Sequence, residues 1–275
     1  MGRSPGPELL SCACATMLLL LPGANGQAAA VGLLPGANGQ VAAVGASRNF
    51  WENTASKTFS HTEYNQWLVS KEDVVAQWDS TWLKSFACLL TPDSRVVDYG
   101  IGACLLGETL LSRYNISHYI GIDLADRQLE ACGKNLASKF SASRYTLLRA
   151  DALPDLEPLK PTHFVSQAVI QHFPSRLYYE SFAARINAAS TLHAVMLQPR
   201  VGKPSERDAY HDTRKRLKKK ELGVTLALVL DEKDVPNALS NFTLVGRTQG
   251  KKGYAFYTLM RTPLSHPQCA FAINN

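Results

Sequence analysis

The sequence has no pattern that marks a metal centre or a disulfide framework. Its six cysteines include no CxxC pair, and its seven histidines include no HExxH or HxH pattern. These absences exclude the common spacings of zinc ligands. We therefore expect no metal site. We also expect the cysteines to be buried thiols that pack as small apolar side chains, without disulfide bonds.

An apolar run near the N-terminus is too short to span a membrane. Residues 9–21 (LLSCACATMLLLL) follow Arg3 and precede Ala24 and Gly26, which have the spacing that a signal peptidase reads. A spanning helix needs about 20 apolar residues, so this run is typical of a secretory signal or an organelle-targeting leader. We expect no stable membrane span in the mature chain.

Two copies of a repeated unit follow this run, LLPGANGQAAAVG at 20–32 and LLPGANGQVAAVG at 33–45. Both copies are rich in glycine, alanine and proline, carry no charge and offer no amphipathic face that could be buried. We therefore expect residues 1–45 to be a disordered leader outside the folded part of the chain.

After this leader, short apolar strands alternate with helices, which predicts a parallel sheet covered by helices on both faces. The segment 241–261 resembles two strands around a glycine turn and predicts a closing antiparallel hairpin. We therefore expect an α/β fold with a Rossmann-like, doubly wound sheet. The expected strands are 94–100, 118–123, 145–151, 162–168 and 191–199, and the expected helices are 103–113, 125–138 and 175–189.

Three other segments complete the expected organisation. An apolar side chain at every fourth position of 71–90 predicts one packing helix, so residues 46–93 read as an N-terminal helical cap. Residues 206–222 predict a basic helix, and 226–239 predict a strand followed by a helix. The main domain then covers residues 94–265, and a short tail covers 266–275.

The stretch VVDYGIGACLLG (96–107) runs from an apolar strand through two glycines into a helix. In open α/β sheets, ligands bind beyond the carboxyl ends of the strands, where such a turn lies. A phosphate-binding loop would need a lysine where Glu108 stands, although Gly102 and Gly107 have the required spacing. A dinucleotide fingerprint would need a third glycine where Leu105 stands.

A third interpretation starts from the acids at the strand ends. Asp98 precedes Gly100 and Gly102, and Asp123 ends the next strand. Glycines let a ligand approach the backbone closely, and a carboxylate can accept two hydrogen bonds from ribose hydroxyls. The pattern indicates a ligand with a cationic amino acid end and a ribose but no phosphate. Each acid could instead cap the helix that follows it.

The stretch DYGIGAC resembles the first motif of the class I S-adenosylmethionine-dependent methyltransferases, acid-x-Gly-x-Gly-x-Gly, with Cys104 at the third glycine position. GIDLADRQLEACGKNL, RADALPDL, SQAVIQHFP and GYAFYTLMR resemble later parts of that family, in order. The resemblance covers about residues 47–263 and implies that 94–265 form a methyltransferase domain with S-adenosyl-L-methionine as its cofactor. The cofactor-binding residues that it implies are Asp98, Gly100, Gly102, Asp123, Leu124, Asp151, Ala152 and Gln167.

The family also implies roles for these residues. Asp98 would anchor the amino acid end of the cofactor, Asp123 would bind the ribose, and Asp151 would meet the adenine amino group. His172, after the expected fourth strand, is the candidate catalytic base because imidazole titrates near neutral pH. It could equally serve in packing.

The expected activity is methyl transfer to an oxygen, nitrogen or sulfur atom of a small-molecule substrate. The basic segment 206–222 leaves a protein or RNA methyltransferase open as an alternative. Its lysines and arginines have no interleaved aromatic residues to stack on bases, so we do not expect a nucleic acid partner. A non-catalytic scaffold protein that only binds the cofactor is the other alternative.

The expected location of the protein rests on conflicting signals. Sequons at Asn115 and Asn241 matter only in a secretory lumen, whereas the cofactor that the resemblance implies is made in the cytosol. We favour an intracellular location, cytoplasmic or organellar, while the leader keeps a secretory route open.

Overall fold

The computed structural model describes residue 52 and residues 71–102, 104–149, 155–202, 228–250 and 253–261. Several predictions fall elsewhere in the chain. The leader, the basic segment 206–222, the tail 266–275 and the pair Asp151 and Ala152 lie outside the described residues. Among the described helices, none combines the length and the apolar character needed to cross a membrane.

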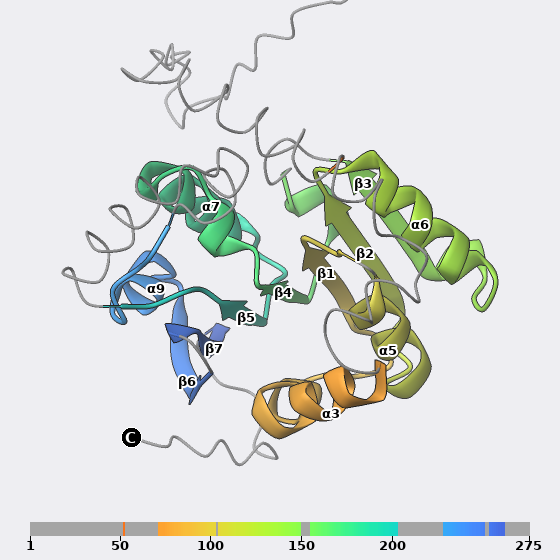
Figure 1. Ribbon diagram of the computed structural model, residues 1–275, viewed down its shortest axis with the longest axis horizontal. Helices are drawn as coiled ribbons and strands as arrows, with labels where there is room; N and C mark the ends of the chain where they lie inside the picture. Colours follow the sequence, from red (N-terminus) through yellow and green to blue (C-terminus); the bar gives the residue numbers. More distant parts are fainter. Residues whose placement is uncertain are drawn as a thin grey trace, which may run out of the picture. The chain divides into compact units, whose positions relative to one another are not determined.

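A seven-stranded sheet forms the centre of the described chain, in the order β3-β2-β1-β4-β5-β7-β6 (Figure 1). The first five strands run parallel, and β7 is antiparallel to both β5 and β6. The predicted mixed α/β sheet with a closing antiparallel hairpin is confirmed. The strands are β1 (Arg95–Tyr99), β2 (His118–Asp123), β3 (Tyr145–Arg149), β4 (His163–Gln167), β5 (Ala194–Gln198), β6 (Phe242–Gln249) and β7 (Ala255–Arg261).

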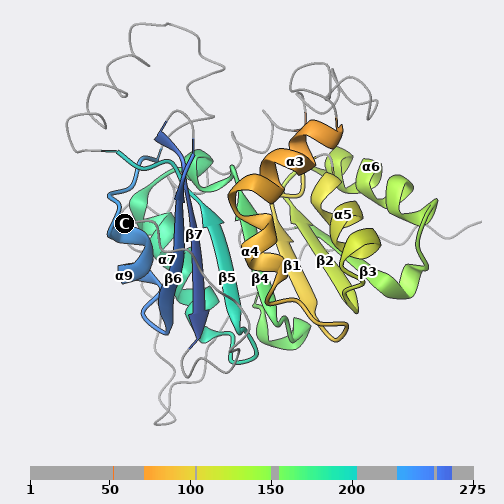
Figure 2. The same cartoon turned by 90° about the horizontal axis from the view of Figure 1, so that it is seen from below.

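Helices cover both faces of the sheet, as the sequence predicts (Figure 2). Successive strand residues point to opposite faces, so Val97 and Tyr99 pack in the layer of α7 and α9 while Val96 packs in the layer of α4 and α5. The helices are α3 (Lys71–Thr81), α4 (Leu83–Ala87), α5 (Leu105–Arg113), α6 (Asp126–Ala137), α7 (Arg176–Ala188) and α9 (Asp234–Ala238).

The predicted single helix over 71–90 is wrong, because the chain forms α3 and α4 with a break at Trp82. The backbone of Trp82 leaves the helical region at φ −137°. Its side chain is 2% exposed and stacks on Phe256 of β7, with ring centroids 6.5 Å apart. The apolar stripe is still a packing surface, since Trp78, Trp82 and Phe86 all lie in the core.

The strand predicted at the start of 226–239 is also wrong within the described residues. Leu230 makes one isolated bridge to Val201, and the helix that follows is α9. Leu230 pairs with the segment that follows β5, and β5 itself already has β4 and β7 as its two neighbours. A strand at Leu230 therefore has no free edge of β5 to pair with.

The expectation that all cysteines are unbridged thiols is wrong as well. Cys104, just before α5, and Cys132, within α6, form a disulfide with their Cα atoms 5.1 Å apart. The pairing was not visible in the sequence because 28 residues separate the two positions. The fold brings them together by packing α5 and α6 side by side on one face of the sheet (Figure 2).

Candidate functional site

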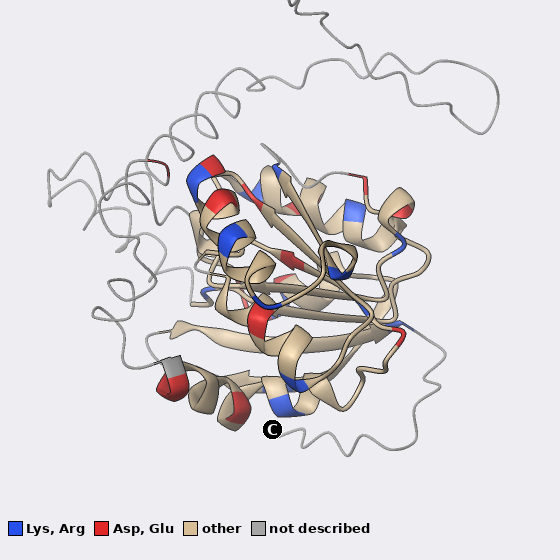
Figure 3. Cartoon of the chain, turned by 90° about the vertical axis from the view of Figure 1, so that its right-hand side faces the viewer, with Lys and Arg blue, Asp and Glu red and all other residues tan. Residues whose placement is uncertain are grey.

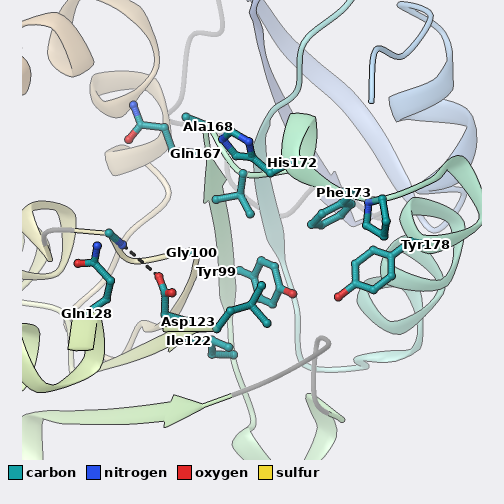
Figure 4. Close-up of a pocket in the computed structure, with 14 residues that line it drawn as sticks. Tyr99, Gly100, Ile122, Asp123, Gln128, Gln167, Ala168, His172, Phe173 and Tyr178 are labelled. Carbon is teal, nitrogen blue, oxygen red and sulfur yellow. Dashed lines mark hydrogen bonds between the residues drawn. The ribbon is translucent and has the colours of Figure 1, made fainter. Parts of the chain in front are cut away.

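A pocket lies beyond the carboxyl ends of β1, β2 and β4, where an open α/β sheet binds its ligands (Figure 4). The turn after β1 and the start of α6 form one side of it, and the segment from the end of β4 to α7 forms the other. Its lining residues are Tyr99, Gly100, Gly102, Ile122, Asp123, Leu124, Gln128, Gln167, Ala168, Val169, His172, Phe173, Pro174 and Tyr178.

The two glycines of the turn are needed for different reasons. Gly100 has φ +85°, and a Cβ placed on it would lie 2.1 Å from Cγ2 of Val169. Gly102 has φ +49°, and a Cβ there would meet no atom within 4 Å. Gly100 is therefore required by close packing within the protein. Gly102 leaves open space at its backbone, which a ligand can approach.

Asp123 closes the turn from the end of β2. Its Oδ2 accepts a hydrogen bond from the Gly102 amide at 3.3 Å, the contact drawn in Figure 4, and its Oδ1 accepts one from the Ala125 amide at 3.0 Å. Burial raises the pKa of this carboxyl to about 6, against the lowering effect of these backbone donors. A carboxylate has about four acceptor positions, so two amide contacts leave capacity for a bound ligand.

Asp98 lies beneath the turn and does not line the pocket. It is 3% exposed, and its Oδ2 accepts a hydrogen bond from the hydroxyl of Tyr119 at 2.8 Å. Burial, reinforced by the charge of Asp123, raises its pKa to about 7, while the Tyr119 contact acts in the opposite direction. The ring of Tyr119 covers Gly107 of α5, where a Cβ would lie 2.5 Å from the ring. Gly107 thus serves helix packing.

The segment after β4 forms the opposite wall of the pocket. Ala168 adopts φ +54°, which is uncommon for a residue with a side chain, and Gln167 and Val169 on either side of it line the pocket. The segment then enters a short 3-10 helix, Ile170–His172.

His172 faces the pocket from this wall. Burial lowers the pKa of its imidazole to about 4, while a backbone hydrogen bond with Ala168 acts in the opposite direction. Its Nε2 lies 3.3 Å from Nε2 of Gln171. The side chain is consequently a neutral imidazole at pH 7.

An aromatic wall, which the sequence analysis missed, consists of Tyr99, Phe173 and Tyr178. The ring centroid of Phe173 lies 6.3 Å from that of Tyr99 and 4.8 Å from that of Tyr178, and both pairs are in edge-to-face contact. The hydroxyls of Tyr99 and Tyr178 point toward one another (Figure 4), and burial raises the pKa of Tyr99 well above its usual value. Strand alternation was the available signal, because Tyr99 must face opposite to Asp98.

Two polar residues near α6 were also missed. Gln128 is 5% exposed and lines the pocket from the first turn of α6. Glu52 accepts hydrogen bonds from the first amides of this helix, at 2.6 Å from Asp126 N and 3.4 Å from Arg127 N. No sequence pattern connects Glu52 with this distant helix terminus.

The structure thus brings together six of the predicted site residues in one pocket: Gly100, Gly102, Asp123, Leu124, Gln167 and His172. Asp98 lies behind the turn, and Asp151 and Ala152 lie outside the described residues. Acid, glycine turn, imidazole and aromatic wall make a pocket that can hold a ligand with hydroxyl groups and an apolar or cationic end.

Comparisons with known proteins agree on the fold. No family model and no curated protein sequence matches this chain. Among solved structures, a SAM-dependent methyltransferase from Anabaena variabilis is similar at 12% identity and a TM-score of 0.52, with 79% of this chain and 94% of that chain covered. A protein from Bordetella parapertussis described as possibly exported is similar at 13% identity and a TM-score of 0.50, with 65% of each chain covered. The chain has the fold of the class I methyltransferases.

Proposed function

We propose that this protein is an S-adenosylmethionine-dependent methyltransferase that acts on a small-molecule substrate. The observation that carries the proposal is the position of Asp123, whose carboxylate faces the pocket beside the open backbone of Gly102. On a class I methyltransferase fold, this is where an acid at the end of the second strand can accept both ribose hydroxyls.

The residues of the pocket fit the cofactor along its length. The open side of Gly102 allows the methionine end to approach the turn. Asp123 binds the ribose hydroxyls. In the proposal, the adenine is contacted by four residues: Leu124, Gln128, Asp151 and Ala152. Gln167 and Ala168 bound the methionine end from the opposite wall.

Asp98 contributes from behind the turn. Its carboxylate is buried and does not line the pocket, so it acts through its charge or through a bridging water molecule. A cationic ammonium group nearby favours the ionised carboxylate. Binding of the cofactor would therefore lower the pKa of Asp98 from its raised value.

When bound, the cofactor supplies a methyl group on a sulfonium, which a nucleophile displaces in line. The protein's own contribution is alignment and exclusion of water. Tyr99, Phe173 and Tyr178 provide the apolar surface for that exclusion, and their electron-rich faces favour a positive charge nearby.

His172 is proposed as the residue that contacts the acceptor group. Its imidazole is neutral at pH 7 and can accept a hydrogen bond, but a pKa of about 4 makes it a weak proton acceptor. This basicity suits a nucleophile that is already deprotonated or that carries no proton to lose, such as a thiolate or a ring nitrogen.

The charges of the described surface favour a small-molecule substrate over nucleic acid. Basic and acidic residues are interspersed on the helices in the view of Figure 3. Several form ion pairs, including Arg113 with Asp79 at 2.9 Å and Lys139 with Glu108 at 2.7 Å. A nucleic acid partner needs clustered cations on one face, whereas these cations of the described residues are paired with acids.

Calorimetric titration of the full chain with S-adenosylhomocysteine tests the proposal. Asp123→Asn should weaken binding at least about tenfold, because hydrogen bonds to a charged acceptor contribute about 1.5–3 kcal/mol. Asp126→Asn is the matched control, since this neighbouring aspartate is half-buried, does not line the pocket and forms an ion pair with Arg149 at 3.4 Å. Absence of binding by folded wild-type protein would refute the cofactor assignment.

Turnover distinguishes an enzyme from a non-catalytic scaffold. We expect release of S-adenosylhomocysteine when the full chain is incubated with the cofactor and a panel of small thiols, phenols and heterocyclic amines. Tight cofactor binding without release of S-adenosylhomocysteine for any acceptor would favour a non-catalytic scaffold protein. Release only with protein or RNA acceptors would favour a protein or RNA methyltransferase.

A further inference from the structure

The disulfide between Cys104 and Cys132 joins the two segments that form one side of the pocket. Cys104 is two residues after Gly102 and stands just before α5, and Cys132 lies within α6. Their Cα separation of 5.1 Å is normal for a disulfide. The bridge therefore links the glycine turn directly to the helix beside it.

Helix α6 carries pocket residues at the same end. Gln128 lines the pocket and lies four residues before Cys132, so the two side chains share one face of the helix. The helix follows directly on Asp123, which holds the Gly102 amide. A displacement of α6 relative to the turn would therefore change the spacing of groups proposed to bind the cofactor.

One of the bridged residues, Cys104, has an unfavourable backbone conformation. Cys104 has φ +65°, in the left-handed region that a residue with a Cβ rarely adopts. Both cysteines are buried, at 0% and 1% exposure, within the core cluster that includes Ile101 and Tyr119. Two unbonded thiols need more room than two bonded sulfurs, and a close-packed core has little room to give.

We propose that Cys104–Cys132 is a thiol–disulfide site that controls affinity for the cofactor, an inference that rests on the proposed function. In the oxidised protein the bridge fixes the turn in its binding conformation. After reduction Cys104 is no longer held in the left-handed region, the turn relaxes, and the cofactor binds more weakly.

The chemical step is a thiol–disulfide exchange with a dithiol reductant. A thiolate of the reductant attacks one sulfur of the bridge, a mixed disulfide forms, and the second thiol of the reductant resolves it. The protein gains two electrons and two protons as two thiols, and the reductant becomes a cyclic disulfide. Because both cysteines are buried, the exchange requires a local opening of the core around the bridge.

Reciprocal coupling provides a second signature. If oxidation strengthens cofactor binding, then bound cofactor must stabilise the disulfide by the same factor. Saturating S-adenosylhomocysteine should therefore shift the thiol–disulfide equilibrium of Cys104–Cys132 toward the bridge in a buffer of reduced and oxidised dithiothreitol. A bridge that is not coupled to the cofactor site would have the same equilibrium with and without the ligand.

The test compares the affinity of the full chain for S-adenosylhomocysteine after incubation with oxidised or reduced dithiothreitol. We expect the reduced protein to bind at least about fivefold more weakly, the lower end of typical coupling between sites. In oxidised dithiothreitol, Cys132→Ala should bind as weakly as the reduced wild-type protein. Any further change in its affinity on reduction measures the contribution of the other cysteines. Circular dichroism verifies that each form is folded.

Trapping thiols with N-ethylmaleimide and mapping the labelled peptides by mass spectrometry gives the reduced fraction at Cys104 and Cys132 themselves. Equal affinity in the two redox states, or a reduced fraction at equilibrium that the ligand does not change, would overturn this inference while leaving the cofactor assignment intact. Absence of binding in the oxidised wild-type protein would instead refute the proposed function, and this inference with it.

Discussion

Replacing Gly100 with alanine should destabilise the protein because the new Cβ has nowhere to go. It would lie 2.1 Å from Cγ2 of Val169 and 3.2 Å from both Cβ and Cγ1 of that residue. Valine has a stiff χ1 angle, so rotation of its side chain gives little relief. The backbone at φ +85° adds a second cost, because this region disfavours any residue with a Cβ.

The size of the effect follows from these two terms. Left-handed backbone costs a non-glycine residue about 1–2 kcal/mol, and overpacking a close-packed site costs about 1–3 kcal/mol. We therefore expect Gly100→Ala to lower the free energy of unfolding by about 2–5 kcal/mol. Urea unfolding followed by circular dichroism measures this loss.

A double-mutant cycle separates the two terms. Val169→Ala removes both methyl groups that meet the new Cβ and leaves only the contact with its own Cβ at 3.2 Å. In that background, Gly100→Ala should therefore lower the free energy of unfolding by the backbone cost and only a small part of the packing cost. Gly102→Ala is the matched control, since its Cβ meets no atom within 4 Å and should cost about 1–2 kcal/mol. A loss below about 1 kcal/mol for Gly100→Ala, or no recovery in the Val169→Ala background, would refute the packing explanation.

Three further predictions concern titration and redox chemistry. The pKa of Asp98 is raised to about 7 in the folded protein, so the folded protein binds this proton more tightly than the unfolded chain does, and the free energy of unfolding should fall as pH rises from about 4 to 7. Asp98→Asn should flatten this pH dependence in urea unfolding, and an unchanged slope would contradict the prediction. His172, with its pKa lowered to about 4, should show no imidazole protonation above about pH 5 in NMR titration of the full chain, with loss of the signal in His172→Gln as the assignment control. Reduction should lower the free energy of unfolding by about 3–4 kcal/mol more in the wild-type protein than in Cys132→Ala, because only the wild-type protein has the bridge that closes the loop from Cys104 to Cys132.

The positions of the parallel strands and of the closing antiparallel hairpin could be predicted from the sequence, because each strand is a short apolar run and each is followed by a distinct helix or turn. All five parallel strands and the closing hairpin lie within a few residues of the predicted positions. The break between α3 and α4 could not be predicted, because it depends on the contact between Trp82 and Phe256, which are 174 positions apart in the sequence.

The candidate site was predictable only where backbone and side chain act locally. Asp123 ends β2, and Gly100 and Gly102 lie in the turn that follows β1, so their place at the sheet edge depends on topology alone. Phe173 and Tyr178 line the pocket because the chain turns back after β4 and enters α7, a path that no spacing in the sequence reveals. The bridge from Cys104 to Cys132 depends in the same way on how two helices pack.

The two buried carboxyls, Asp98 and Asp123, have a calorimetric consequence. With pKa values of about 7 and about 6, both hold part of a proton near neutral pH. A cationic ligand at the turn would lower both values and expel that proton into the solvent. The heat measured on binding would then include the ionisation heat of the buffer, and titrations in two buffers would count the protons released.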